Sequence, residues 1–321
     1  MIELIAFLFG ALFGSFANVC IYRLPRIHPQ LTEQSLRVLA ADMPAEMLAK
    51  LAPLQNQAYL TGNDLIAALE AQLGKEAVDR YGDLIFQAAA FRKESIVFPG
   101  SHCPRCQTPI KPWDNVPIVS FLLLRGKCRA CQAKISWRYP FVELLTALLF
   151  AAVVHQFGLT PATLAYLGFV LALLAISFID FDHLIIPDEI TLPGIVIGLI
   201  ASFWLPLPAT FTHWDGALLG ALVGGGLIAL VGYVGRWVFK KEAMGGGDVK
   251  LMAMIGAFLG WQMVFLTMFF ASTVGAVIGI IMKFKSGNEY IPFGPFLSLG
   301  AIIALFFGQQ FLGWYGNLIF P

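Results

Sequence analysis

Two aspartates lie at the edges of strongly apolar stretches of the chain, where carboxylates are costly. Asp180 ends the apolar run of residues 171–179, and Asp248 follows three glycines, at 245–247, and precedes another apolar run. A carboxylate at a bilayer edge usually faces a cavity, a partner or a substrate. The glycines allow backbone conformations closed to other residues and let another chain approach closely. Both aspartates are therefore candidates for chemistry.

A pair of carboxylates can perform acid–base chemistry if the fold brings the two together. Like-charge repulsion then leaves one ionised and one protonated, and the pair titrates as a unit. The ionised carboxylate can take a proton from water while the protonated one polarises a peptide carbonyl. This is the chemistry of aspartic proteases, and the sequence contains no H-E-x-x-H motif, nucleophile elbow or Walker loop that would indicate another reaction.

Neighbouring acidic residues offer alternatives to this assignment. Asp182 follows in the short connection after Asp180 and competes with it as the reacting group, although Asp182 and His183 could also be solvated. Asp188 is expected to cap the next helix or to lie in its first turn, where negative charge suits the helix dipole. Capping would also explain Asp248, but it would not explain the three glycines before it.

Four cysteines form two C-x-x-C pairs with 21 residues between them. Cys103 pairs with Cys106, and Cys128 with Cys131. Two such knuckles complete a tetrahedral four-thiolate shell for zinc, which leaves no open position and is therefore structural. Two disulfides are the alternative, which a cytoplasmic location disfavours. Cys20, in the first apolar run, is expected to act as a small hydrophobic residue.

The composition is that of an integral membrane protein. Of 321 residues, 58% are hydrophobic and 13% are charged, with a mean hydropathy of +0.75, whereas soluble domains contain about 25% charged residues. The apolar runs lie at roughly 2–22, 141–157, 162–180, 189–206, 216–238, 249–260, 262–282 and 295–313. Most approach the length of about 20 residues needed to span a bilayer. We expect an all-α polytopic fold with about eight transmembrane helices, in which the short run 249–260 is tilted, broken or partly re-entrant.

The charge distribution predicts the orientation. Of the 21 Lys and Arg residues, 15 lie in 23–138, and the remainder lie at or next to connections on the same side. By the positive-inside rule this segment is cytoplasmic and the N-terminus lies outside. The N-terminus lacks the basic start and cleavage site of a secretory signal, so we expect a retained first helix. The net charge of +1 does not indicate a nucleic-acid partner.

These patterns divide the chain into three parts. Residues 1–22 form a first transmembrane helix, 23–138 a cytoplasmic domain, and 139–321 the membrane domain that carries both aspartates. The cytoplasmic domain comprises an insert at 29–94 and the four-cysteine segment 95–138. Within the insert, a helix is expected to begin at a cap on Thr61 or Asn63, to place Leu65, Ile66, Leu69 and Leu73 on one face, and to stop at Gly74.

Several of these motifs, in this order, resemble those of the bacterial type IV prepilin peptidases, which are aspartic membrane proteases with a G-x-G-D motif. The resemblance covers most of the chain. It rests on Gly14–Val19, Tyr22–Arg26, Phe98–Cys103, the paired cysteines, Ile179–Asp180, Pro187–Asp188, Gly245–Asp248 and Ile291–Pro295. The insert at 29–94 looks longer than is usual in the family.

The resemblance implies a function. Members cleave the short basic leader of prepilins or pseudopilins after a glycine, at the cytoplasmic face of the bacterial inner membrane. They then methylate the new N-terminal residue, usually Phe, with S-adenosylmethionine. Carried over by motif, Asp180 and Asp248 are catalytic, the four cysteines hold zinc, and Gly126 and Lys127 are candidates for the methyltransferase cofactor site.

The expected partners of the protease are prepilins and membrane lipid, with Ile291–Pro295 and the glycine run forming a groove for an extended peptide.

Two other functions compete with the protease. One alternative is an ion-coupled transporter that uses the membrane carboxylates. Its carboxylates would be expected at the midplane rather than at one face, and no internal repeat is visible. The other is a zinc-containing membrane scaffold without catalysis.

Overall fold

The computed structural model describes residues 1–27, 33–54, 62–89, 96–97, 100–204, 214–240, 244–286 and 292–319. In these ranges every regular element is a helix, and two isolated β-bridges accompany them. The all-α prediction is confirmed. Thr61, Phe98, Pro99 and Ile291, on which expectations were placed, lie outside the described residues.

The chain forms two compact units, one of Met1–Asn18 with Lys111–Pro321 and one of Val19–Ile110. The boundary at Ile110 falls inside the segment 95–138, which the sequence predicts as a single region. The first unit contains the first helix up to Asn18, all the later apolar helices, the 3-10 helix η2 and the short helix α6. The bounds of these two short elements are Pro112–Asn115 for η2 and Val119–Leu123 for α6.

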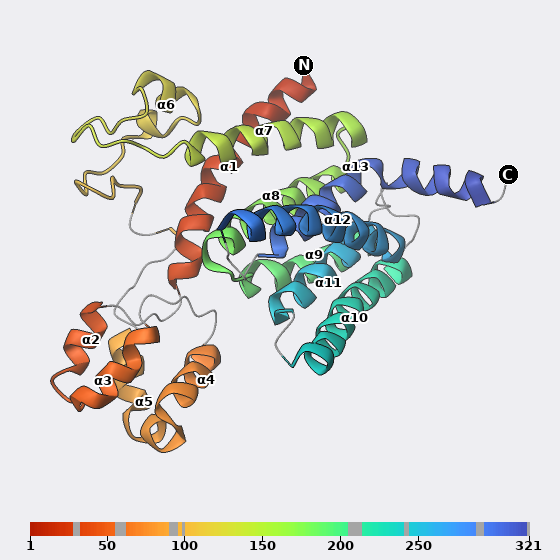
Figure 1. Ribbon diagram of the computed structural model, residues 1–321. Coiled ribbons are helices and arrows are strands. Elements are labelled where there is room, and N and C mark those ends of the chain that lie inside the picture. The colour runs from red at the N-terminus through yellow and green to blue at the C-terminus, as the bar shows by residue number, and fades with distance from the viewer. Residues whose placement is uncertain are drawn as a thin grey trace. The chain divides into compact units, whose positions relative to one another are not determined.

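In the described residues, eight apolar helices make up the membrane part of the chain, and Figure 1 labels each of them. They are α1 (Ile2–Ile27), α7 (Arg138–Phe157), α8 (Pro161–His183), α9 (Asp188–Trp204), α10 (Trp214–Phe239), α11 (Gly246–Leu259), α12 (Trp261–Ser286) and α13 (Gly294–Ile319). Among the described residues, six are long and apolar enough to cross a membrane, and these exclude α9 and α11. The chain is therefore a multi-pass membrane protein, and its described residues contain six candidate spans and two shorter apolar helices, where the sequence suggested about eight spans.

The first helix is longer than its apolar run. It ends at Ile27 rather than near Tyr22 and contains Pro25. Arg23 and Leu24 are good helix formers, so the helix continues where the hydropathy falls. Hydropathy marks the part of the helix that suits lipid, not the residue at which the helix ends.

The short helix α11 is enclosed by α9 and α10 (Figure 1). Glycines on both neighbours allow this approach. A Cβ added to Gly220 of α10 would overlap the backbone of Gly256, and one added to Gly198 of α9 would lie 2.9 Å from the ring of Phe258. Small residues let membrane helices pack closely in this way.

Burial explains how α11 can be short. It has 14 residues, about 21 Å at 1.5 Å per residue, against a hydrocarbon thickness of about 30 Å. Its residues from Leu251 to Leu259 are buried apart from Ala253, so it rests on protein and not on lipid. It ends at Gly260, whose φ of +81° turns the chain into α12. The run 249–260 is thus one short, enclosed helix.

We expect Gly256→Ala to destabilise the membrane domain by about 1–3 kcal/mol or more, the usual range for overpacking. The added methyl group would overlap the Gly220 carbonyl, and backbone cannot move aside as a flexible side chain can. Thermal unfolding in detergent measures the effect. Gly226→Ala in α10 is the matched control, because a Cβ there meets nothing within 4 Å. Equal midpoints for the two variants would contradict this packing.

The remaining membrane helices pack through further close contacts. In α1, a Cβ on Gly10 would lie 2.7 Å from Cα of Ala147, which brings α1 against α7. In α13, a Cβ on Gly300 would lie 3.2 Å from the backbone nitrogen of Ala271 in α12. The helix α8 contributes Tyr166 and many other buried side chains to the core.

The second unit contains a small helical cluster. Its elements are α2 (Glu33–Leu39), α3 (Ala45–Leu51), η1 (Ala52–Leu54), α4 (Gly62–Leu73) and α5 (Lys75–Ala89). Leu39, Leu51, Leu69 and Ile85 are fully buried in its core. The helix α4 stops before Gly74, which has a φ of +83°, as the sequence predicts. Ile66, however, is exposed rather than on the buried face.

Candidate active site and metal site

Asp180 lies near the C-terminal end of α8 and is buried, with 5% of its surface exposed. Its Oδ2 accepts a hydrogen bond of 2.9 Å from the backbone N–H of Gly294. Gly294 is the first residue of α13, and the first N–H groups of a helix have no partner within that helix. A Cβ on Gly294 would lie 2.6 Å from Asp180 Oδ2, so the residue must be glycine for the carboxylate to reach this N–H.

Asp248 occupies the third position of α11. Its Oδ2 accepts a hydrogen bond of 3.2 Å from the N–H of Gly245, the residue that caps this helix. The capping alternative considered for Asp248 takes another form, because Gly245 is the N-cap residue and Asp248 bonds back to it from the third position. It uses one carboxylate oxygen and does not conflict with a second role for the other.

Ile186 connects the surroundings of the two aspartates. A Cβ on Gly247, next to Asp248, would lie 2.8 Å from Cβ of Ile186. A Cβ on Gly294, which hydrogen-bonds Asp180, would lie 3.2 Å from Cδ1 of Ile186. The end of α8 and the starts of α11 and α13 thus converge on one buried isoleucine. The fold brings Asp180 and Asp248 into one neighbourhood.

The other two aspartates in this region are paired with cations. Asp182 lies in the last turn of α8, not in a connection, and its carboxylate forms an ion pair with Arg138. The expectation that Asp182 lies in a loop is wrong because α8 continues to His183. Asp188 begins α9, as expected, and accepts hydrogen bonds of 2.7 and 2.8 Å from Lys250 Nζ. These ion pairs leave Asp180 and Asp248 as the pair without a cationic partner among the contacts described.

Both ion pairs had a signal in the sequence that was not used. Lys250 stands in the second turn of an apolar helix, and Arg138 at the start of another. Charges in such places pair with other charges or with backbone. Arg138 also donates a hydrogen bond to the carbonyl of Phe178, so it ties the start of α7 to the end of α8.

The four paired cysteines form a cluster that could hold a metal ion. Their sulfur atoms all lie within 4.8 Å of one another. Four thiolates at 2.3 Å from a tetrahedral zinc are separated by about 3.8 Å, so the arrangement is close to such a shell. Cys103 is buried and Cys131 is exposed.

The two knuckles share a backbone design. The carbonyl of Cys103 accepts a hydrogen bond from the N–H of Gln107, and that of Cys128 accepts one from Gln132. Gln107 and Gln132 have φ values of +57° and +58°. Each cysteine pair is thus followed by a glutamine in the left-handed region, which turns the chain back. The repeated C-x-x-C-Q pattern would have revealed this from the sequence.

Comparison with known proteins identifies the family. A model of the type IV leader peptidase family matches residues 167–280, and a model of the bacterial peptidase A24 N-terminal domain matches residues 8–157. A relative from Stutzerimonas stutzeri is 38% identical over 317 residues, which are 97% of this chain and 93% of the relative. The chain belongs to the type IV leader peptidase family.

Other relatives of this leader peptidase carry the same name. The Pseudomonas aeruginosa relative is 46% identical over 220 residues, or 67% of this chain and 74% of its own. The Aeromonas hydrophila relative is 36% identical over 318 residues, or 97% and 92%. All three relatives are called prepilin leader peptidase/N-methyltransferase. No solved structure matched the chain. The resemblance stated from the motifs is confirmed.

Gly126 and Lys127, the candidates for the methyltransferase cofactor site, lie in a turn of the leader peptidase. Gly126 has a φ of +66°, and a Cβ there would lie 3.0 Å from the ring of Phe121. Lys127 forms an isolated β-bridge with Lys134. The turn therefore accounts for the glycine by itself, and a part in cofactor binding stays a prediction.

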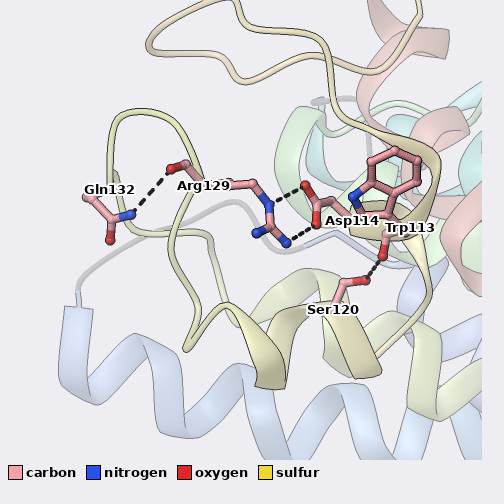
Figure 2. Close-up of polar contacts among 5 residues, drawn as sticks. All are labelled: Trp113, Asp114, Ser120, Arg129 and Gln132. Carbon is pink, nitrogen blue, oxygen red and sulfur yellow. Dashed lines mark hydrogen bonds and ion pairs between the residues drawn. The ribbon is translucent and has the colours of Figure 1, made fainter.

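Polar contacts connect the segment before α6 with the turn that contains Arg129 (Figure 2). Arg129 donates hydrogen bonds of 2.6 and 2.8 Å to the carboxylate of Asp114, and Ser120 Oγ donates one of 2.8 Å to the carbonyl of Trp113. The Arg129 guanidinium holds the pKa of Asp114 below its usual value. Asp114 therefore stays ionised and the ion pair persists at neutral pH.

Proposed function

We propose that this chain cleaves the leader peptide of type IV prepilins or pseudopilins and then methylates the new N-terminus. The observation that carries the proposal is that Gly247, beside Asp248, and Gly294, which hydrogen-bonds Asp180, both pack against Ile186 in a chain of the leader peptidase family. Two carboxylates in one apolar neighbourhood suit the activation of water for peptide hydrolysis.

The proposed mechanism divides the work between the two carboxylates. Asp180 and Asp248 each use Oδ2 to accept a backbone N–H, so we assign the contact with water to the Oδ1 atoms. One carboxylate, ionised, takes a proton from the attacking water. The other, protonated, donates a hydrogen bond to the scissile carbonyl and stabilises the oxyanion as it forms. The proton then passes to the leaving amine.

The position of the site suits the substrate. Asp180 lies at the end of one candidate span, and Asp248 at the start of a helix. With the charge distribution, we propose that both face the cytoplasm, in the bacterial inner membrane, with the N-terminus outside. A prepilin is a membrane helix with a basic leader on the cytoplasmic side, so its cleavage site would meet the aspartates without leaving the bilayer surface.

The two further groups that the function implies have unequal support. Cys103, Cys106, Cys128 and Cys131 would hold a zinc ion, which would supply structural stability rather than a reacting site. S-adenosylmethionine would supply the methyl group. We retain Gly126 and Lys127 as candidates for its site on the ground of their place beside Cys128.

Incubating the full-length protein in detergent with a prepilin and S-adenosylmethionine tests the proposal. We expect mass spectrometry to find a mature pilin that has lost its leader and gained one methyl group at its N-terminus. An unprocessed prepilin would contradict the protease assignment. Proton uptake by proteoliposomes without cleavage would instead favour the ion-coupled transporter.

A further inference from the structure

A short segment between the two cysteine pairs exposes large apolar side chains. It comprises η2 and α6, residues 112–123. Leu122 and Leu123 in α6 are 63% and 78% exposed, and Trp113 in η2 is 63% exposed. Trp137, whose ring packs edge-on against Phe121 of α6, is 73% exposed. We call these four residues, with Val119, the α6 face. An exposed apolar cluster of this kind marks a site of contact with a membrane or another protein.

The depth of α6 beside the membrane helices is fixed by one hydrogen bond. The N–H of Ile118, which caps α6, donates to Glu143 Oε2 at 2.7 Å. Glu143 lies five residues inside α7, about 7 Å along the helix from its start at Arg138. Arg138 and Glu143 both belong to the candidate span Arg138–Phe157. The start of α6 therefore lies alongside the membrane-spanning part of α7 and not beyond its end.

A second contact supports this depth. A Cβ on Gly14 would lie 2.7 Å from Cα of Glu143, so Glu143 packs against a residue of a second candidate span, Ile2–Pro25. Exposed side chains of α7 continue the apolar surface, among them Phe141 and Leu144. The α6 face, through Trp137, thus adjoins the exposed apolar side chains of α7, a candidate membrane span.

The backbone at Ile118 is held in an unusual conformation. Its φ of +61° is rare for a β-branched residue, and strain of this kind persists only where neighbouring contacts determine it. The hydrogen bond from Ser120 to Trp113 and the one from Ile118 to Glu143 supply such contacts. Together they direct the α6 face away from the protein.

The charge of the segment matches an anionic membrane. Residues 111–138 contain six Lys or Arg residues and a single acidic residue, Asp114, which is paired with Arg129. Basic residues near a bilayer surface are attracted to anionic lipids. Tryptophans are also enriched where membrane meets water.

We propose that the α6 face inserts into the cytoplasmic leaflet, so that this part of the chain is a monotopic membrane element beside α7. The occupant of the face is the interfacial region of an anionic bilayer, with acyl chains against Leu122 and Leu123 and headgroups against the nearby cations. The segment that the sequence assigns wholly to the cytoplasm thus dips into the lipid between its two cysteine pairs.

Fluorescence quenching in vesicles tests this insertion. The full-length protein is reconstituted in phosphatidylglycerol-containing vesicles with lipids brominated near the carbonyl end of the acyl chains. The emission of Trp113 is obtained as the difference between the unsubstituted protein and Trp113→Phe. We expect bromolipid to quench this emission by at least the fraction lost by Trp314, obtained in the same way. Trp314 is the control because it is exposed within the candidate span Gly294–Leu318.

Aqueous iodide supplies the opposite measurement. We expect iodide to leave the Trp113 emission nearly unchanged. Quenching by iodide and not by bromolipid would overturn the proposal, since the face would then lie in water. Protection from both quenchers would overturn it as well, because a protein, either a prepilin or a second copy of this chain, would then cover the face.

Glu143 variants test what sets the depth. Glu143→Gln keeps a carbonyl oxygen that can accept the Ile118 N–H, whereas Glu143→Leu removes the acceptor. We expect bromolipid quenching of Trp113 to persist in the first variant and to fall in the second. Equal quenching in both would overturn the role assigned to Glu143.

Discussion

Replacing either Asp180 or Asp248 by asparagine should reduce prepilin cleavage by about 10³-fold or more, since a positioned acid or base contributes about 10²–10⁴-fold and here one pair supplies both. Asparagine keeps the shape of the side chain and can still accept the N–H of Gly294 or Gly245. It cannot accept a proton from water. The measurement is the initial rate of leader removal from a purified prepilin by each full-length variant.

Asp182→Asn is the matched control for this prediction. Asp182 lies two residues after Asp180 in α8, but its carboxylate forms a partly exposed ion pair with Arg138. Exposed ion pairs contribute about 0–1 kcal/mol to stability. We expect its variant to cleave at nearly the original rate. Retained cleavage in Asp180→Asn or Asp248→Asn, or loss confined to Asp182→Asn, would refute the catalytic pair.

Replacing Cys103 by serine should abolish zinc binding at the proposed four-thiolate site. Zinc held by four thiolates contributes about 10–16 kcal/mol in small metal domains at neutral pH, so loss of one thiolate has a large effect on the local fold. We expect the zinc content, measured by mass spectrometry of the purified protein, to fall from one ion per chain to a small fraction. Methylation of the processed pilin should fall with it.

Cys20→Ser is the control for the zinc prediction. Cys20 lies in α1 and is not a member of the four-cysteine cluster. Its replacement should leave the zinc content unchanged. Unchanged metal content in Cys103→Ser would reject the four-thiolate shell. A protein without zinc that still methylates would separate the metal from the second activity.

The sequence predicted the helices better than their limits. Hydropathy marks which residues suit lipid, and it found all eight apolar helices. It did not find the end of α1 at Ile27, because helix propensity continues past the apolar run. The shortness of α11 was noticed, but its enclosure depends on glycines of α9 and α10 that lie about 30 to 60 residues away in sequence.

The site shows a similar division. Motifs identified Asp180 and Asp248, and glycines marked the places where the backbone comes close. The contact of Asp180 with Gly294 joins residues 114 positions apart, and no local pattern encodes it. The pairing of Lys250 with Asp188 separates a structural carboxylate from the proposed catalytic ones. Only the fold distinguishes these aspartates by their partners.

The position of Ile186 has a consequence for how the site can change. In the described residues, no hydrogen bond joins the carboxylates of Asp180 and Asp248. Instead, the aliphatic side chain of Ile186 packs against Gly247 and Gly294, the glycines next to the two carboxylates. We expect the volume of this side chain to affect how closely the starts of α11 and α13 approach each other, although Ile186 takes no part in the chemistry. A larger or smaller side chain at position 186 would therefore change the geometry of the proposed active site while leaving both aspartates and the four cysteines unchanged.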